Sequence, residues 1–194
     1  MEKTDTQLIT DYLNGEEHTL ELLIKRHLKS VYNFVRRFTG NKQDSEDITQ
    51  EVFLKVWKNI KKYRAGESFK TWLFAIAKNT SIDWLRKKKS LVFSEFEGED
   101  GENALLNTLT DPAPLPFEHI VRMQDKKLLD TALEKLSPMY RAVMLLRYHH
   151  HCTFEEIGII LGKPLHTVKS QHRRAIAIMR KLLLEHAPKK DIHP

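Results

Sequence analysis

The chain of 194 residues carries 32 lysines and arginines against 26 aspartates and glutamates, a formal net charge of +6, and 41% of its residues are hydrophobic. That apolar share is sufficient for a packed core and excludes wholesale disorder, while the single cysteine, Cys152, excludes an intrachain disulfide and a metal site made of several cysteines. The sequence shows no signal peptide and no apolar run near the roughly 18 residues of a membrane helix, so we expect a soluble, cytoplasmic protein that is not itself in the membrane.

The charge falls into three blocks. Residues 1–89 carry 18 basic against 12 acidic residues, and residues 118–194 carry 14 against 8, whereas residues 90–117 hold six acidic residues, three prolines and no basic residue. This pattern predicts two small domains, 1–89 and 118–188, joined by a flexible acidic linker, 90–117, and followed by a tail, 189–194. Two basic domains favour a polyanionic partner, although a charge of +6 is also ordinary for a solvated surface.

The first block has the apolar spacing of helices. Apolar residues recur at intervals of three and four over residues 16–39, and Gly40 ends the pattern. Asp44 is expected to cap a second helix, and a third helix is predicted over residues 68–88. No segment alternates at period two for long enough to predict a strand, so the expected fold class is all-α.

The third predicted helix and the loop before it combine aromatic with basic residues. Such a combination suits single-stranded DNA or a base pulled from a duplex, because aromatic rings stack on bases and cations follow the backbone. Aromatic residues on an apolar stripe can equally belong to the core, and a basic helix end can be merely solvated. The residues in question are Tyr63, Phe69, Trp72 and Trp84, the basic run 86–89, and Asn79 and Asp83 between them.

The second block predicts a helix-turn-helix. Ser137 before Pro138 has the pattern of a helix start, and Thr153 with Glu156 forms a capping box that opens a short helix. A turn at Gly162 then leads into a helix rich in Lys, Arg, Ser and Gln, whose side chains can bond phosphates and base edges in a major groove. Many helical hairpins have such turns, so the pattern alone leaves a plain helical hairpin open.

Together, the motifs resemble those of a bacterial sigma factor of the extracytoplasmic-function (ECF) group. The resemblance covers nearly all of the chain except the acidic linker, in the family's order and spacing. The segments that carry it are DITQEVFLKVW (47–57), FKTWLFAIAKN (69–79), DWLRK (83–87), LSPMYR (136–141), FEEI (154–157), TVKS (167–170) and RA (174–175).

The resemblance implies an all-α protein that is not an enzyme, needs no cofactor and has no small-molecule substrate. Its expected partners are core RNA polymerase, promoter DNA and an anti-sigma factor. The residues implied to bind core polymerase are Asp47, Gln50, Glu51, Phe53 and Trp57, of which the two aromatic residues can equally belong to the core. Those implied to bind and melt the −10 element are Tyr63, Arg64, Ser68, Phe69, Lys70, Trp72, Asn79, Asp83, Arg86, Lys87 and Lys88. Those implied to read the −35 element are Pro164, Thr167, Lys169, Ser170, Arg173 and Arg174.

Two features depart from the family pattern. His166, Gln171, His172 and Arg173 replace the residues usual there, at positions expected on the DNA-reading face. The turn before the capping box reads His-His-His-Cys over residues 149–152, which suggests metal binding or redox sensing. Consecutive residues cannot all point at one ion, and zinc sites use spaced pairs, so a structural turn is favoured and no metal site is predicted.

Three other functions agree less well with the sequence. A stand-alone helix-turn-helix regulator would leave the aromatic and basic helix of the first domain unexplained. An adaptor that binds polymerase without opening DNA has the same difficulty. An enzyme is disfavoured because the sequence shows no catalytic carboxylate motif, no Gly-rich phosphate loop and no Ser-His-Asp signature.

Overall fold

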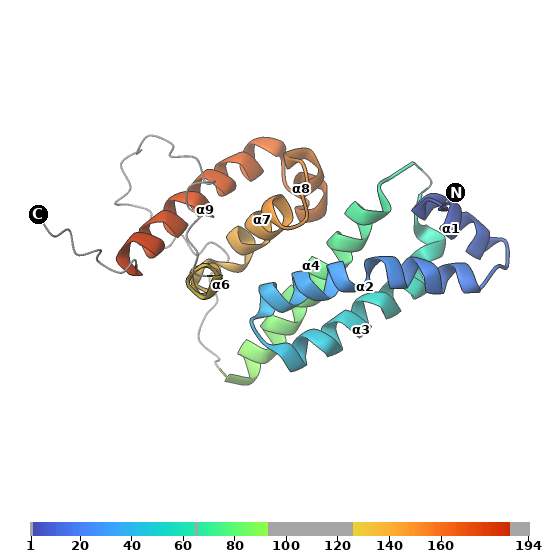
Figure 1. Cartoon of the computed structure of the whole chain (residues 1–194), viewed down its shortest axis with the longest axis horizontal. Helices are drawn as coiled ribbons and strands as arrows, with labels where there is room; N and C mark the ends of the chain where they lie inside the picture. Colours follow the sequence, from blue (N-terminus) through green and yellow to red (C-terminus); the bar gives the residue numbers. More distant parts are fainter. Residues whose placement is uncertain (1, 65, 93–125, 187–194) are drawn as a thin grey trace, which may run out of the picture.

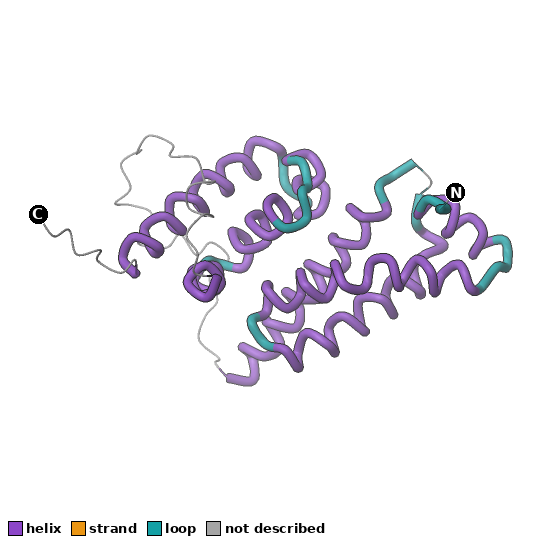
Figure 2. The backbone as a smooth tube through the Cα atoms, viewed as in Figure 1, coloured by secondary structure: helices purple, strands orange, loops and turns teal. Residues whose placement is uncertain are grey.

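The computed structural model describes residues 2–64, 66–92 and 126–186 (Figure 1). Within these ranges the regular elements are helices joined by short loops, without a strand (Figure 2), which confirms the predicted all-α class. Residues 90–92 continue the helix before the predicted linker. The rest of that linker, the predicted start of the second domain and the predicted tail lie outside the described residues.

The N-terminal group contains four α-helices and a short 3-10 helix. Helices α2, α3 and α4 pack against one another, and α1 packs on α2. Gly40 ends α2 in the left-handed conformation (φ 76°) that its position requires, as the sequence predicted. The elements are α1 (Asp5–Leu13), α2 (His18–Thr39), α3 (Lys42–Asn59), η1 (Ile60–Lys62) and α4 (Phe69–Val92).

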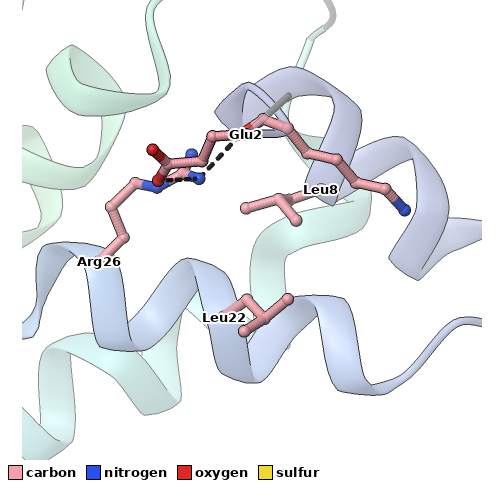
Figure 3. A pocket seen from close by; sticks show the side chains of 5 residues that line it. Glu2, Leu8, Leu22 and Arg26 are labelled. Atoms are coloured by element: carbon pink, nitrogen blue, oxygen red, sulfur yellow. Dashed lines mark hydrogen bonds and ion pairs between the residues drawn. The ribbon is translucent and has the colours of Figure 1, made fainter.

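Helix α1 was not expected from the apolar pattern. The side chain of Thr4 caps it and forms a reciprocal capping box with Gln7. Arg26 of α2 then holds the start of the chain by donating to Asp5 and to the Lys3 carbonyl, both at 2.7 Å. Arg26 also bonds Glu2 at 3.1 Å, beside an open groove of about 480 Å³ lined by Leu8 and Leu22 among others (Figure 3). Lys3, which also lines the groove, pairs with Asp11 at 2.7 Å, so each ionic group of the groove has a partner.

The cap of α3 differs from the predicted one. Asn41, not Asp44, is the capping residue, and its side-chain oxygen accepts from the Asp44 amide at 3.1 Å. The Asp44 carboxylate instead pairs with Lys88 at 2.6 Å, which joins the first turn of α3 to the last turns of α4. An N-cap oxygen accepts from the backbone amide two or three residues further along the chain, and Asn41 lies three residues before Asp44.

The C-terminal group contains α6 (Lys126–Lys135), α7 (Pro138–Tyr148), α8 (Phe154–Leu161) and α9 (Leu165–His186). The predicted starts are confirmed: Ser137 caps α7 with Pro138 in its first turn, and Thr153 and Glu156 form the capping box of α8. Gly162 ends α8 with φ 64°, and the chain turns directly into α9, as a helix-turn-helix requires.

The buried residues of the two helical groups form one core. Helix α4 packs against α8, and α2 packs against α7 and α6. Phe34, Phe38 and Phe74 of the first group are fully buried, as are Leu145 and Leu146 of the second. In the described part of the chain, none of the helices is both long and apolar enough to cross a membrane.

Candidate nucleic-acid interface

One face of α9 presents the side chains predicted to read duplex DNA. Val168, Ala175 and Met179 point inward and are buried, because α9 packs on α7 and α8 through them. The opposite face therefore carries the polar residues outward. Pro164, Lys169, Arg173 and Arg174 are exposed on it, while Thr167 and Ser170 are half-buried.

His172 does not lie on that face, contrary to the sequence-based expectation. Its ring stacks on Tyr148 and meets Phe154 edge-on, and its Nε2 lies 3.0 Å from the Tyr148 hydroxyl. Burial, and then the nearby Arg147, lower the pKa of His172 to about 4, so its ring is neutral at pH 7. It supports the helix pair α7–α8 rather than DNA contact.

Close packing inside the helix-turn-helix depends on Gly158. A Cβ added there would lie 2.9 Å from the Lys163 carbonyl oxygen, part of the backbone that turns from α8 into α9. We expect Gly158→Ala to lower the free energy of unfolding by about 1–3 kcal/mol, because that backbone must shift. Urea denaturation measures the change. Ile159→Ala, at a neighbouring side chain that is 70% exposed, is the control and should stay within about 0.5 kcal/mol. Equal losses would contradict the steric argument.

The loop before α4 is held by a cluster of aromatic rings. Tyr63, Phe69 and Trp72 lie with ring centroids 5.7–5.8 Å apart, and the Tyr63 hydroxyl donates to the Glu67 carbonyl. Tyr63 is 9% exposed and Phe69 is 3% exposed, so these two rings shape the loop and are not free to stack on a base here. Their predicted DNA contact is therefore not available in this conformation. Trp72 is half-buried, and Arg64 and Ser68 are exposed on the loop itself.

Beyond the loop, α4 carries an outward stripe at helical spacing. Asn79, Asp83 and Arg86 are exposed along one side, and Lys87 and Lys88 extend the positive end, with Lys88 paired to Asp44. Lys78 is a residue that the sequence analysis missed: it is 8% exposed and donates to Asn79 Oδ1 at 2.6 Å. Burial disfavours the charged ammonium group and lowers the pKa of Lys78, which lies beside the predicted DNA-binding residue Asn79.

A second exposed stripe lies on α3. The stripe contains Asp47, Gln50 and Trp57. Between them lies Leu54, which is 46% exposed; it was not among the predicted residues, although its spacing fits the stripe. Glu51 is half-buried and pairs with Lys55 at 2.8 Å. Phe53 is 8% exposed and faces the core, so its predicted role as a docking anchor does not fit this structure.

Trp57 is held in place from α1. Its indole Nε1 donates to the Tyr12 hydroxyl at 3.1 Å while the ring stays 52% exposed. A large aromatic side chain that is both exposed and fixed in orientation is typical of an anchor for a protein partner.

The histidine-rich turn forms no metal centre in the part of the chain that the structure describes, where no three His, Cys, Asp or Glu side chains cluster closely enough to hold an ion. Within this turn, His150 is 8% exposed and Cys152 is 1% exposed, whereas His151 is exposed with φ 51°. His150 is buried against the other helical group, which the sequence did not reveal.

Two families match the chain over the two helical groups. Sigma-70 region 2 matches residues 23–91, and sigma-70 region 4 matches residues 126–179. The first range contains the exposed stripes of α3 and α4, and the second contains the helix-turn-helix.

Individual relatives cover most of the chain. ECF RNA polymerase sigma factor SigW of Bacillus subtilis is 30% identical over 94% of this chain and 98% of the relative. ECF RNA polymerase sigma factor SigE of Mycolicibacterium smegmatis is 33% identical over 85% of this chain and 62% of the relative.

Solved structures share the fold. CnrH in complex with the cytosolic domain of CnrY has a TM-score of 0.67 at 20% identity, covering 94% of this chain and 99% of that chain. The sigma factor RpoE from Bartonella quintana, in complex with the anti-sigma factor NepR, has a TM-score of 0.65 at 21% identity, covering 87% and 98%.

Proposed function

Because the chain belongs to the ECF group of RNA polymerase sigma factors, we propose how its three outward faces divide the work of a promoter-specificity factor that directs transcription initiation. The α3 stripe with Trp57 binds core RNA polymerase. The α4 stripe with Asn79 and its preceding loop binds and melts the −10 element. The α9 face with Arg173 and Arg174 reads the −35 element as duplex. The protein acts in the cytoplasm, where the polymerase and the chromosome are.

The observation that carries this division is the separation of three exposed faces on three helices with different chemistry. The α3 face offers an aromatic anchor beside an acid and an amide, which suits a protein surface. The α9 face offers exposed cations around a helix start, which suits phosphates and the guanine edge in a major groove. The α4 face offers an amide and cations next to an aromatic loop, which suits an unpaired strand.

In this proposal the three faces bind the polymerase and position the promoter DNA. The protein carries out no chemistry of its own, because the polymerase synthesises the phosphodiester bonds. The RpoE structure was solved with an anti-sigma factor. We therefore propose that an anti-sigma factor also controls this protein by covering one or more of the three faces.

The test of the proposal is run-off transcription with purified core polymerase. The full chain is added to core enzyme and a library of duplex promoters, and the RNA is mapped to its start sites. We expect start-specific RNA that requires the protein, and sequencing of the transcribed templates identifies both promoter elements. Absence of RNA together with absence of co-elution on core polymerase would instead leave the stand-alone helix-turn-helix regulator.

Arg174→Ala tests the reading face of α9. With the polymerase complex, we expect binding to the preferred −35 sequence to weaken by about 1–3 kcal/mol, and discrimination at one base position to relax. Promoter titrations at fixed salt measure this change. The matched control, Lys29→Ala, removes an exposed charge from α2 and should leave binding unchanged. An equal loss on every promoter sequence would make Arg174 a phosphate contact.

A further inference from the structure

The histidine-rich turn over residues 149–152 joins the two helical groups. His150 Nδ1 lies 3.3 Å from the Ser30 hydroxyl of α2, and its ring centroid is 4.4 Å from that of Phe74 on α4. It also meets Phe34 of α2 edge-on at 5.7 Å. Both phenylalanine rings are fully buried, so the imidazole fills an apolar gap between the groups.

Two charged side chains close the same interface. Lys70 of α4 donates to the His150 carbonyl at 2.5 Å. Arg141 of α7 donates to the Phe38 carbonyl near the end of α2 at 2.6 Å, and its remaining nitrogens bond carbonyls of Leu133, Glu134 and Leu136. Each cation thus satisfies one backbone oxygen across the boundary, which makes this arrangement of the groups specific.

The interface occupies one residue that the proposed function needs. Lys70 belongs to the set predicted to bind the −10 element, yet here its ammonium group is bonded to the turn. Lys78, next to Asn79, is 8% exposed on the helix that packs against α8. The turn and an unpaired DNA strand therefore compete for Lys70, while Asn79, Asp83 and Arg86 of α4 stay exposed.

The surroundings of His150 disfavour a charged ring. Arg37 of α2, Lys70 of α4, and His149 and His151 of the turn face it, so the charges nearest to it are positive or become positive on protonation. The neighbouring acids act on adjacent residues of the turn: Asp130 of α6 faces His149, and Glu156 of α8 faces Cys152. Burial first, and these cations second, lower the pKa of His150 to about 3.

We propose that the 149–152 turn is a proton-responsive latch, which holds the two helical groups closed over α4 while His150 is neutral and opens when His150 is protonated. The part of this inference that concerns DNA rests on the proposed function; the closure itself does not.

The sign of the pH dependence follows from the two states. The open form lets His150 titrate near its ordinary pKa of 6.5, whereas the closed form holds that pKa at about 3. The open form therefore binds more protons between these values, and closure weakens as the pH falls below 6.5. From pH 7.5 to pH 5.5, the ratio of closed to open molecules should fall about tenfold through His150 alone.

Single-molecule energy transfer in the full chain measures that ratio. Dyes are attached at pH 7.5 to Leu13→Cys and Leu184→Cys, two exposed positions in different helical groups. The native Cys152 is buried, and burial raises the pKa of its thiol, so it labels slowly. We expect the closed-to-open ratio to fall about tenfold at pH 5.5. The fall should persist in His18→Gln, which changes an exposed histidine, and disappear in His150→Gln.

An unchanged ratio in the parent chain, or the same fall in His150→Gln, would overturn the latch. A parallel titration with single-stranded DNA separates the two proposals. About tenfold tighter binding at pH 5.5, absent in His150→Gln, supports competition for Lys70. A pH-dependent closure without any DNA binding would support the latch and count against the assigned role of α4.

Discussion

Phe34→Ala is expected to lower the free energy of unfolding by about 3–5 kcal/mol, the largest stability effect that we predict. Phe34 is fully buried and its ring meets Phe38, Phe74 and His150, with centroids 5.4–5.7 Å away. Truncation removes one ring from contacts with α4 and with the histidine turn, and leaves a cavity where both helical groups meet. Urea denaturation followed by circular dichroism measures the shift of the midpoint.

Two variants calibrate this result. Phe34→Leu keeps most of the apolar volume and should cost clearly less than the alanine. Leu184→Ala, at a side chain that is 65% exposed on α9, should stay within about 0.5 kcal/mol. A Phe34→Ala loss no greater than that of Leu184→Ala would show that the shared core does not carry the stability of the chain.

Trp57→Ala is expected to weaken binding to core RNA polymerase by about 2 kcal/mol, or roughly 30-fold in Kd, without a comparable loss of stability. The indole is 52% exposed, and its bond to the Tyr12 hydroxyl holds it ready for a partner. A preformed anchor loses little side-chain entropy on binding, so its removal costs more than that of a mobile side chain. Fluorescence anisotropy of the labelled full chain with core enzyme gives the Kd.

The control for this prediction is Leu22→Ala. Leu22 is 48% exposed on α2, beside the groove at α1, and lies outside the α3 stripe (Figure 3). The Leu22→Ala variant should bind core polymerase with a Kd within about a factor of two of the parent chain. Tyr12→Phe removes only the hydrogen bond and should weaken binding less than Trp57→Ala. Equal Kd values for Trp57→Ala and Leu22→Ala would remove α3 from the docking face.

The features that the sequence predicts well depend on neighbours a few residues apart. The start of α7 at Ser137, the capping box at Thr153 and the end of α8 at Gly162 all appear in the structure where the sequence places them. Each is a contact over three or four residues, so local chemistry suffices to specify it. The exposed polar residues of α9 follow from the same short period.

Burial of aromatic residues is harder to predict, because an apolar or aromatic residue can face either the core or a partner. Phe53 and Phe69 belong to recognisable motifs, yet the packing of α3 and α4 in the N-terminal group covers both. Trp57, four residues after Phe53, stays 52% exposed, because α2 and α4, which pack on α3, leave much of its ring uncovered. The helical period identifies the faces but not what covers each of them.

Local sequence thus determined most of the helices, most of their ends and the polar face of α9 except His172, because hydrogen-bonded caps and the helical repeat act over one turn. Only the tertiary structure decided that His150 of the histidine-rich turn is buried, because Lys70 and Ser30, which bond it, lie 80 and 120 residues away along the chain. Burial and the pKa of His150 depend on side chains brought together from such distances, and no local pattern encodes them.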